Sequence, residues 1–198
     1  MTGKLVNVII VWQPAFVAGR RAVRNRQAGR YVMYKKGWGY TMLFLLPVGI
    51  FLLDRLVKVW AQRSLSVMPG GIQLLPGIMR LTYAENTGMA FGFLSGQRWL
   101  LVLLSLAAVA AVVFSLRPYR LGLWAKLSLL SIFGGMLGNL ADRMFMGYVV
   151  DMFDFSFVRF AVFNVADMFI SFGAVFLCIS LLFRPDDWRR KGEKAQAS

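Results

Sequence analysis

The chain has 198 residues, of which 58% are hydrophobic and only 16% charged, a composition that excludes a water-soluble domain of this size and predicts a membrane protein. Its 23 Lys and Arg outnumber its 9 Asp and Glu, but they form short clusters between apolar runs, so membrane topology explains them better than a nucleic-acid partner. Histidine is absent, which excludes Ser-His-Asp and Cys-His catalytic sites and histidine-bound zinc.

Residues 1–35 are predicted to form a basic, mobile leader on the cytoplasmic side. Their apolar stretch, residues 5–16, is shorter than the roughly 20 residues of a membrane-spanning helix and contains Asn7, Gln13 and Pro14. A weak signal-like segment is one interpretation, and a mobile basic leader, or a start codon placed too early with Met33 opening the part of the chain that matters, is the simpler one. We find no chemistry in this leader.

Four apolar segments are each long enough to cross about 30 Å of hydrocarbon as a helix. They cover residues 41–60, 98–116, 121–142 and 163–183. Basic residues precede the first segment, separate the second from the third and follow the fourth, which predicts that both termini are cytoplasmic. The fold class is therefore predicted to be all-α and integral to the membrane, with four transmembrane helices in a domain of residues 36–185 and a basic cytoplasmic tail of residues 186–198.

Two segments are predicted to lie outside the membrane. Residues 61–97 contain several Pro and Gly residues that break them into extended pieces, such as 72–75 and 80–83, so we expect a small β-element on the membrane surface between the first two helices. Residues 143–162 contain the run 148–155, which is too apolar for a solvated loop. We expect this run to dip back into the membrane interface.

The third and fourth segments also contain features of helix packing. Gly134, Gly135 and Gly138 form a stripe of small residues that predicts the close approach of another helix. The single cysteine, Cys178, lies within an apolar run and can form no intrachain disulfide. We expect Cys178 to pack against lipid or a neighbouring helix.

Ionisable residues inside membrane spans are costly and therefore candidates for function. If the spans alternate in direction, these residues all lie near the outer face, where Asn86 and Gly88 also enter. The spans carry Asp54, Arg55, Lys58, Asn139, Asp142, Arg143, Asn164 and Asp167. Their positions predict that polar groups from distant parts of the chain converge at one end of the helices.

The spacing of these residues separates two interpretations. Asp54 with Lys58, and Asp142 with the adjacent Arg143, can be ion pairs that make charges tolerable in a helix bundle. Asp151 and Asp167 have no adjacent basic residue, which favours a chemical role for these two carboxylates.

Four ordered motifs resemble the signature blocks of the lipoprotein signal peptidase family. They are Asn-Thr-Gly-Met-Ala-Phe at 86–91, Gly-Asn-Leu-Ala-Asp-Arg at 138–143, Val-Val-Asp at 149–151 and Phe-Asn-Val-Ala-Asp at 163–167. Asp54 with Lys58 is similar to the family's first block. The resemblance covers residues 38–185, and the leader before it is longer than the family usually has.

The resemblance implies an aspartyl endopeptidase of the bacterial inner membrane, with its active site toward the periplasm. It implies cleavage of diacylglyceryl-modified prolipoproteins just before the lipidated cysteine, by a monomer in contact with membrane lipid and without a metal or another cofactor. The implied catalytic residues are Asp151 and Asp167. The implied binding or supporting residues are Asp54, Lys58, Asn86, Gly88, Asn139, Asp142, Arg143, Asn164 and Ala166.

Two carboxylates held close together share one proton, so that one can activate water while the other polarises a carbonyl. One alternative is a magnesium-dependent membrane lipid transferase, in which Asp142, Asp151, Asp154 and Asp167 hold the metal. Another is a proton-coupled transporter with a carboxylate pair, although its site would be expected near the middle of the membrane. The four motifs favour the peptidase.

Overall fold

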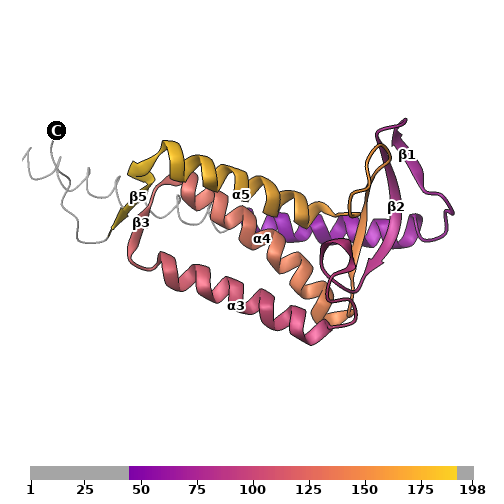
Figure 1. Ribbon diagram of the computed structural model, residues 1–198, viewed down its shortest axis with the longest axis horizontal. Helices are drawn as coiled ribbons and strands as arrows, with labels where there is room; N and C mark the ends of the chain where they lie inside the picture. The colour runs from indigo at the N-terminus through magenta and orange to yellow at the C-terminus, as the bar shows by residue number, and fades with distance from the viewer. Residues whose placement is uncertain (1–44, 191–198) are drawn as a thin grey trace, which may run out of the picture. The chain divides into compact units, whose positions relative to one another are not determined.

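The computed structural model describes residues 45–190, and these belong to one compact unit. Residues 1–44 and 191–198, which include the predicted leader and most of the predicted tail, lie outside the described residues. Helices occupy residues 45–64, α3 (Arg98–Leu116), α4 (Leu123–Phe145) and α5 (Val165–Phe183), each within one of the predicted apolar segments to within a few residues (Figure 1). Helix α4 packs against both α3 and α5.

The helices carry apolar side chains outside and polar side chains inside. Leu103 on α3 and Leu182 on α5 are 63% and 75% exposed, whereas Asp54 and Asp142 are fully buried. By length and composition, α4 and α5 can each cross a membrane, and α3 contributes a shorter apolar helix over Arg98–Ala111. This inverted distribution is expected of helices whose outer surface faces lipid.

Small residues set the distance between the helices, as the glycine stripe of α4 predicted. A Cβ atom added to Gly135 would lie 2.4 Å from the carbonyl oxygen of Ala166 at the start of α5. A Cβ atom added to Gly138 would lie 2.4 Å from a carboxylate oxygen of Asp54. These two glycines therefore let α4 approach α5 and helix 45–64 closely enough for polar groups to meet.

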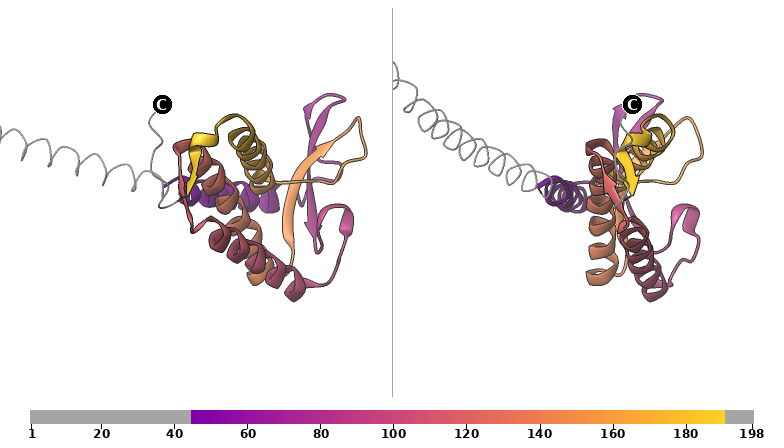
Figure 2. Two further views of the ribbon diagram at one scale, coloured as in Figure 1. Left: turned by 60° about the vertical axis from the view of Figure 1, so that its left-hand side comes forward. Right: turned by 90° about the vertical axis from the view of Figure 1, so that its left-hand side faces the viewer.

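A three-stranded antiparallel sheet lies at one end of the helices (Figure 2), in the order β1 (Ile72–Leu75), β2 (Met79–Asn86) and β4 (Val149–Phe155). Strands β1 and β2 confirm the predicted extended pieces. The third strand, Val149–Phe155, was not predicted, and the dip of residues 148–155 into the membrane interface stays a prediction. The fold class also needs correction: the chain is not all-α, and its sheet is not confined to the segment between the first two helices.

The buried face of β4 explains this difference. Val150 and Met152 are fully buried and pack in a cluster with Ala61 and Leu65 at the end of helix 45–64. Protein side chains therefore cover the buried part of this strand. Pairing of β4 with β2 places Asp151 opposite Ala84 and close to the start of α5.

At the opposite end of the helices, a two-stranded sheet joins β3 (Tyr119–Leu121) to β5 (Trp188–Arg190), which follows the short helix η2 (Pro185–Asp187). The buried Asp187 accepts a hydrogen bond from the Ser180 hydroxyl at 3.3 Å through its carboxylate, and one from the Gly122 N–H at 2.9 Å through its main-chain oxygen. Neither strand was predicted from the sequence. The described part of the chain beyond α5 is thus folded against the connection between α3 and α4.

Candidate active site

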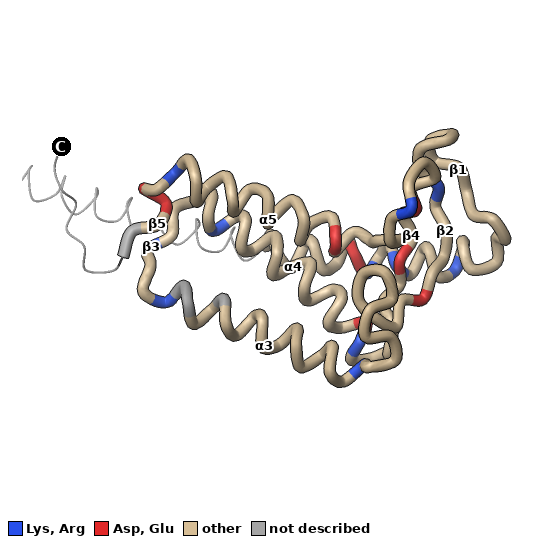
Figure 3. Tube along the Cα trace, viewed as in Figure 1, with Lys and Arg blue, Asp and Glu red and all other residues tan. Residues whose placement is uncertain are grey.

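Charged residues gather at the ends of the helices, and the stretches between are largely uncharged (Figure 3). The sheet end receives Asp54 and Lys58 from helix 45–64, Asn139 and Asp142 from α4, and Asp151 from β4. Asn164 and Asp167 enter at the start of α5, and Asn86 ends β2. The structure therefore brings together side chains whose positions along the chain predicted that they would converge.

Lys58 is the centre of the buried part of this cluster. Its Nζ lies 2.7 Å from Oδ2 of Asp54 and 2.8 Å from Oδ2 of Asp142, and it donates to Oδ1 of Asn139 at 2.9 Å. The pairing of Asp54 with Lys58 confirms the prediction from their spacing. A buried ammonium group has three donors, and here three oxygens face it, so its burial is compensated.

Asp142 has a different partner from the one that the sequence suggested. Its carboxylate binds Lys58 and Arg55, whereas the Arg143 guanidinium donates to the main-chain oxygen of Gly88 at 2.8 Å. The predicted Asp142–Arg143 pair is wrong because adjacent residues on a helix point in different directions. Arg55 enters the cluster, as its place among the converging polar residues predicted, although the family resemblance did not include it among the supporting residues. Arg143 instead ties the loop after β2 to α4.

The start of α5 is held by two sets of hydrogen bonds. The Ala166 N–H, one of the first-turn donors without a partner inside the helix, donates to Oδ1 of Asp54 at 2.9 Å. Asn164 caps the helix, since its side-chain oxygen accepts from the Asp167 N–H at 3.0 Å and its own N–H donates to Oδ2 of Asp167 at 3.2 Å. This capping box fixes one oxygen of the Asp167 carboxylate. The other oxygen, Oδ1, accepts from the Asn139 amide at 2.7 Å.

Asp151 is held by two amides. Its Oδ1 accepts from the Asn164 side chain at 2.6 Å, and its Oδ2 accepts from the Asn86 side chain at 3.0 Å. The Asn86 carbonyl in turn accepts from the Gly88 N–H at 2.9 Å. Burial raises the pKa of Asp151 to about 6; the amides of Asn86 and Asn164 oppose this rise, and the charge of Asp167 adds to it.

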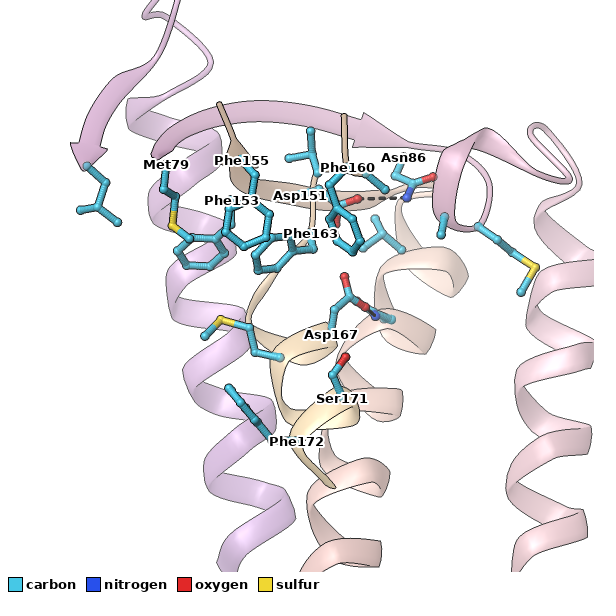
Figure 4. A pocket seen from close by; sticks show the side chains of 18 of the residues that line it. Met79, Asn86, Asp151, Phe153, Phe155, Phe160, Phe163, Asp167, Ser171 and Phe172 are labelled. Atoms are coloured by element: carbon cyan, nitrogen blue, oxygen red, sulfur yellow. Dashed lines mark hydrogen bonds between the residues drawn. The ribbon is translucent and has the colours of Figure 1, made fainter. Parts of the chain in front are cut away.

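The two carboxylates open onto the same cavity, which has a volume of about 680 Å³ (Figure 4). Asn164 connects them, because it donates to Asp151 and forms the capping box with Asp167. Arg143 and Asn139 also line the cavity. The structure thus presents a pair of neighbouring carboxylates, each fixed by amide groups, to a space large enough for a substrate segment.

An aromatic wall faces the carboxylates, and the sequence predictions did not assign it to the site. Its rings belong to Phe153, Phe155, Phe160 and Phe163, with centroids 5.3 Å apart for Phe155 and Phe163 and 5.5 Å apart for Phe153 and Phe163. Figure 4 shows these rings across the cavity from Asp167. The density of Phe over residues 153–163 was the available signal, but it was attributed to the membrane interface.

The magnesium alternative requires four aspartates in one place, and the structure separates them. Asp142 binds Lys58 and Arg55, and Asp154 accepts from Nε of Arg80 at 2.6 Å on the sheet. Over residues 45–190, no group of three or more Asp, Glu or Cys side chains is arranged to hold a metal ion. Only Asp151 and Asp167 of the four line the cavity.

Comparison with known proteins identifies relatives along most of the chain. The family described as signal peptidase (SPase) II matches residues 46–183. The lipoprotein signal peptidase of Clostridioides difficile (strain 630) is 38% identical over 144 residues, which are 73% of this chain and 95% of the relative. That of Nostoc punctiforme is 45% identical over 134 residues, 66% of this chain and 82% of the relative.

The fold also has solved counterparts. A bacterial membrane enzyme structure determined by the in meso method at 2.3 Å resolution superimposes with a TM-score of 0.65 and 26% sequence identity, over 77% of this chain and 94% of that chain. A second such structure, at 1.9 Å resolution, gives a TM-score of 0.64 over 72% of this chain. From these matches, the chain is a membrane protein and belongs to the signal peptidase II family of peptidases.

Proposed function

We propose that the chain is an aspartic endopeptidase that removes the signal peptide from diacylglyceryl-modified prolipoproteins, cutting just before the lipidated cysteine. The observation that carries this proposal is the pair of carboxylates, Asp151 and Asp167, that open onto one cavity and are connected by Asn164. The relatives, named lipoprotein signal peptidases, support the choice of substrate.

The proposed reaction is hydrolysis by a carboxylate pair that shares one proton. The ionised carboxylate takes a proton from water as its oxygen attacks the scissile carbonyl carbon, and the protonated carboxylate donates a hydrogen bond to the carbonyl oxygen. The carbon–nitrogen bond then breaks as the leaving nitrogen receives a proton from the pair. The raised pKa of Asp151 supports such sharing, because this group retains a proton at a pH at which an ordinary aspartate has lost it.

Amide groups position the two carboxylates for this reaction. Asn86, Asn139 and Asn164 each donate to one or both of them, so their orientation is set before the substrate arrives. Asn139 also accepts from Lys58, which links the pair to the buried ionic cluster. We assign these three residues, together with Gly88 and Ala166, a positioning role.

The charged residues around Asp151 and Asp167 suit a carboxylate pair that carries one negative charge in total. Arg55 and Lys58 compensate Asp54 and Asp142, so this cluster adds no net charge beside the cavity. Arg143 is the basic residue that lines the cavity itself. In the proposed mechanism, its positive charge stabilises the one ionised carboxylate of the pair.

The proposed topology places the sheet and the cavity on the periplasmic side of the inner membrane, with all four helices crossing it and both termini in the cytoplasm. Arg117 and Arg120 lie at the end of the helices away from the sheet, as expected of cytoplasmic loops. The active form is proposed to be a monomer, in which one chain supplies every site residue. The peptidase domain is proposed to span residues 36–185.

The test is cleavage by the purified chain in detergent. We expect a diacylglyceryl-modified prolipoprotein to be cut immediately before its lipidated cysteine, with activity unchanged by EDTA. The same prolipoprotein without the lipid serves as the control and should be cut much more slowly. No cleavage of the lipidated substrate, or activity lost with EDTA and restored by magnesium, would refute the proposal.

A further inference from the structure

A second cavity lies between α3, α4 and α5, farther from the sheet than the carboxylate pair. It has a volume of about 620 Å³. Its lining is apolar throughout and consists of Val109, Ala111, Val113, Leu129, Leu130, Ile132, Phe133, Met136, Leu177, Leu181 and Trp188. An apolar lining of this kind selects an apolar occupant and disfavours any polar ligand.

Along α4, one stripe of residues connects this cavity with the carboxylate cavity. Leu129, Ile132 and Met136 line the apolar cavity, and Asn139 and Arg143 line the carboxylate cavity. Their spacing of three, four, three and four residues places all five on one face of the helix. The two cavities therefore lie on the same side of α4.

A matching stripe runs along α5. Asp167 and Ser171 line the carboxylate cavity, and Leu181 lines the apolar one. Ala174 and Cys178 lie between them at the same helical spacing, and both are exposed. We name the surface formed by these two stripes and the facing residues of α3 the trench.

We propose that the trench holds the apolar helix of the signal peptide while the bond beyond it is cleaved. This inference rests on the proposed function. In hydrocarbon, the apolar part of a signal peptide must be helical to satisfy its backbone. Because this part precedes the scissile bond, it must lead from the carboxylate pair toward the opposite face of the membrane. The trench begins at the pair and runs in that direction.

The lengths agree. Fourteen positions separate Asp167 from Leu181, which correspond to about 21 Å of helix at about 1.5 Å per residue. The apolar region of a signal peptide has about 7 to 15 residues, or about 10 to 22 Å as a helix. The peptide helix can therefore lie beside α5 from the carboxylates to the apolar cavity.

Another flank of α5 offers a contrasting surface. Phe176 and Phe183 on this flank are exposed, and Phe176 lies about 200° around the helix from Cys178. Bulky projecting rings there suit contact with lipid, whereas the trench is hollowed by a cavity. The two flanks can be compared directly in one experiment, because Cys178 is the only cysteine in the chain.

The first test is cross-linking. A lipidated prolipoprotein with one added cysteine about 11 positions before the scissile bond is mixed with the Asp151→Asn chain, since Cys178 lies 11 residues beyond Asp167, or about 16 Å. A short bismaleimide should link this cysteine to Cys178 in a manner competed by unmodified lipidated substrate. The matched control is the same chain with Cys178→Ser and Phe176→Cys. Equal or stronger cross-linking at position 176 would overturn the proposal that the signal-peptide helix lies in the trench.

The second test uses catalytically active chains. Leu181→Trp fills the trench, and Phe183→Trp places the same ring on the contrasting flank with Phe176, about 200° around the helix from Leu181. We expect Leu181→Trp to raise KM for the full prolipoprotein by about tenfold at nearly unchanged kcat, and Phe183→Trp to leave both constants unchanged. Cleavage with equal KM in both variants would reject the trench while leaving the proposed function intact. Absence of cleavage by the wild-type chain would instead reject the proposed function.

Discussion

The two ends of the helix bundle each bury polar groups, but they do so differently. At the end away from the sheet, Ser180, Asp187 and Trp188 lie within nine consecutive residues, and their hydrogen bonds close on one another. At the sheet end, Lys58 reaches Asn139, 81 residues away, and Asp54 holds Ala166, 112 residues away. The second cluster places two carboxylates in the lining of a cavity, whereas the first lines the apolar cavity through Trp188 and keeps Asp187 out of that lining.

The two ends show that a buried aspartate can either stabilise the fold or take part in a reaction. The Asp187 carboxylate is bound by the Ser180 hydroxyl, with Arg184 at 3.7 Å, and we interpret this group as a brace for the end of α5. Asp151 and Asp167 receive the amide and N–H donors of Asn86, Asn139 and Asn164, and no ion pair with a basic side chain is found for either within residues 45–190. Burial of an aspartate therefore indicates function only when its neighbours leave it able to exchange a proton.

The largest expected effect is on the carboxylate pair. Asp151→Asn and Asp167→Asn keep the shape of the side chain but cannot share a proton, so each should lower the single-turnover cleavage rate by about a thousandfold or more. The measurement uses chains normalised to folded protein in one detergent. Binding of the lipidated substrate should persist in both variants. A near-normal rate for either variant would mean that the pair is wrongly assigned.

Asp142→Asn should act mainly on stability. The substitution leaves Lys58 and Arg55 with one carboxylate fewer in a buried site, and losing one partner of such a cluster costs about 3 to 5 kcal/mol. Thermal unfolding in detergent should show a lower midpoint than in the wild-type chain. The rate per folded molecule should fall far less than in Asp151→Asn. A stable Asp142→Asn chain without activity would instead give Asp142 a direct part in the chemistry.

The raised pKa of Asp151 predicts a pH effect on stability. Because the folded state holds this proton to about pH 6 and an ordinary aspartate releases it near pH 4, folding binds a proton between these values. The free energy of unfolding should therefore fall as the pH rises through this window, by on the order of 3 kcal/mol from this group. Unfolding midpoints of Asp151→Asn should lack this part of the decline. Parallel pH profiles for the two chains would contradict the assigned shift.

Asp187→Asn tests whether the Asp187 carboxylate stabilises the end of α5 away from the three-stranded sheet. It weakens the bonds to Ser180 and Arg184 but touches no residue of the carboxylate cavity, so we expect a loss of about 1 to 2 kcal/mol in stability and an unchanged kcat. Unfolding and cleavage are measured on the same preparation. A loss of turnover without a loss of stability would show that the two ends are coupled.

Asp154→Asn should have the smallest effect. Its partner Arg80 is 45% exposed on the sheet, and exposed pairs contribute about 1 kcal/mol or less. We expect cleavage within about twofold of the wild-type rate. Arg80→Gln should behave in the same way. If Asp154→Asn abolished cleavage while Asp151→Asn cleaved at a near-normal rate, Asp154 and not Asp151 would belong to the catalytic pair.

Much of the helical framework followed from the sequence because lipid imposes a simple rule. A chain in hydrocarbon must satisfy its backbone within each segment, so long apolar runs predict helices wherever they occur. The same rule made charged residues in those runs conspicuous, and their depth predicted that Asp54, Asn139 and Asp167 would meet. The motifs around Asp151 and Asp167 then identified the family, which the comparisons support.

Tertiary structure alone decided which groups touch. Strand β4 was missed because its partner β2 lies more than 60 residues earlier in the chain, and only that pairing shows that Val150 and Met152 are covered by protein. Asp142 was paired with its neighbour Arg143, whereas the close packing at Gly138 brings helix 45–64, and with it Lys58 and Arg55, to Asp142. Hydropathy and spacing act along one helix at a time, and the partners of buried charges are set by how the helices cross.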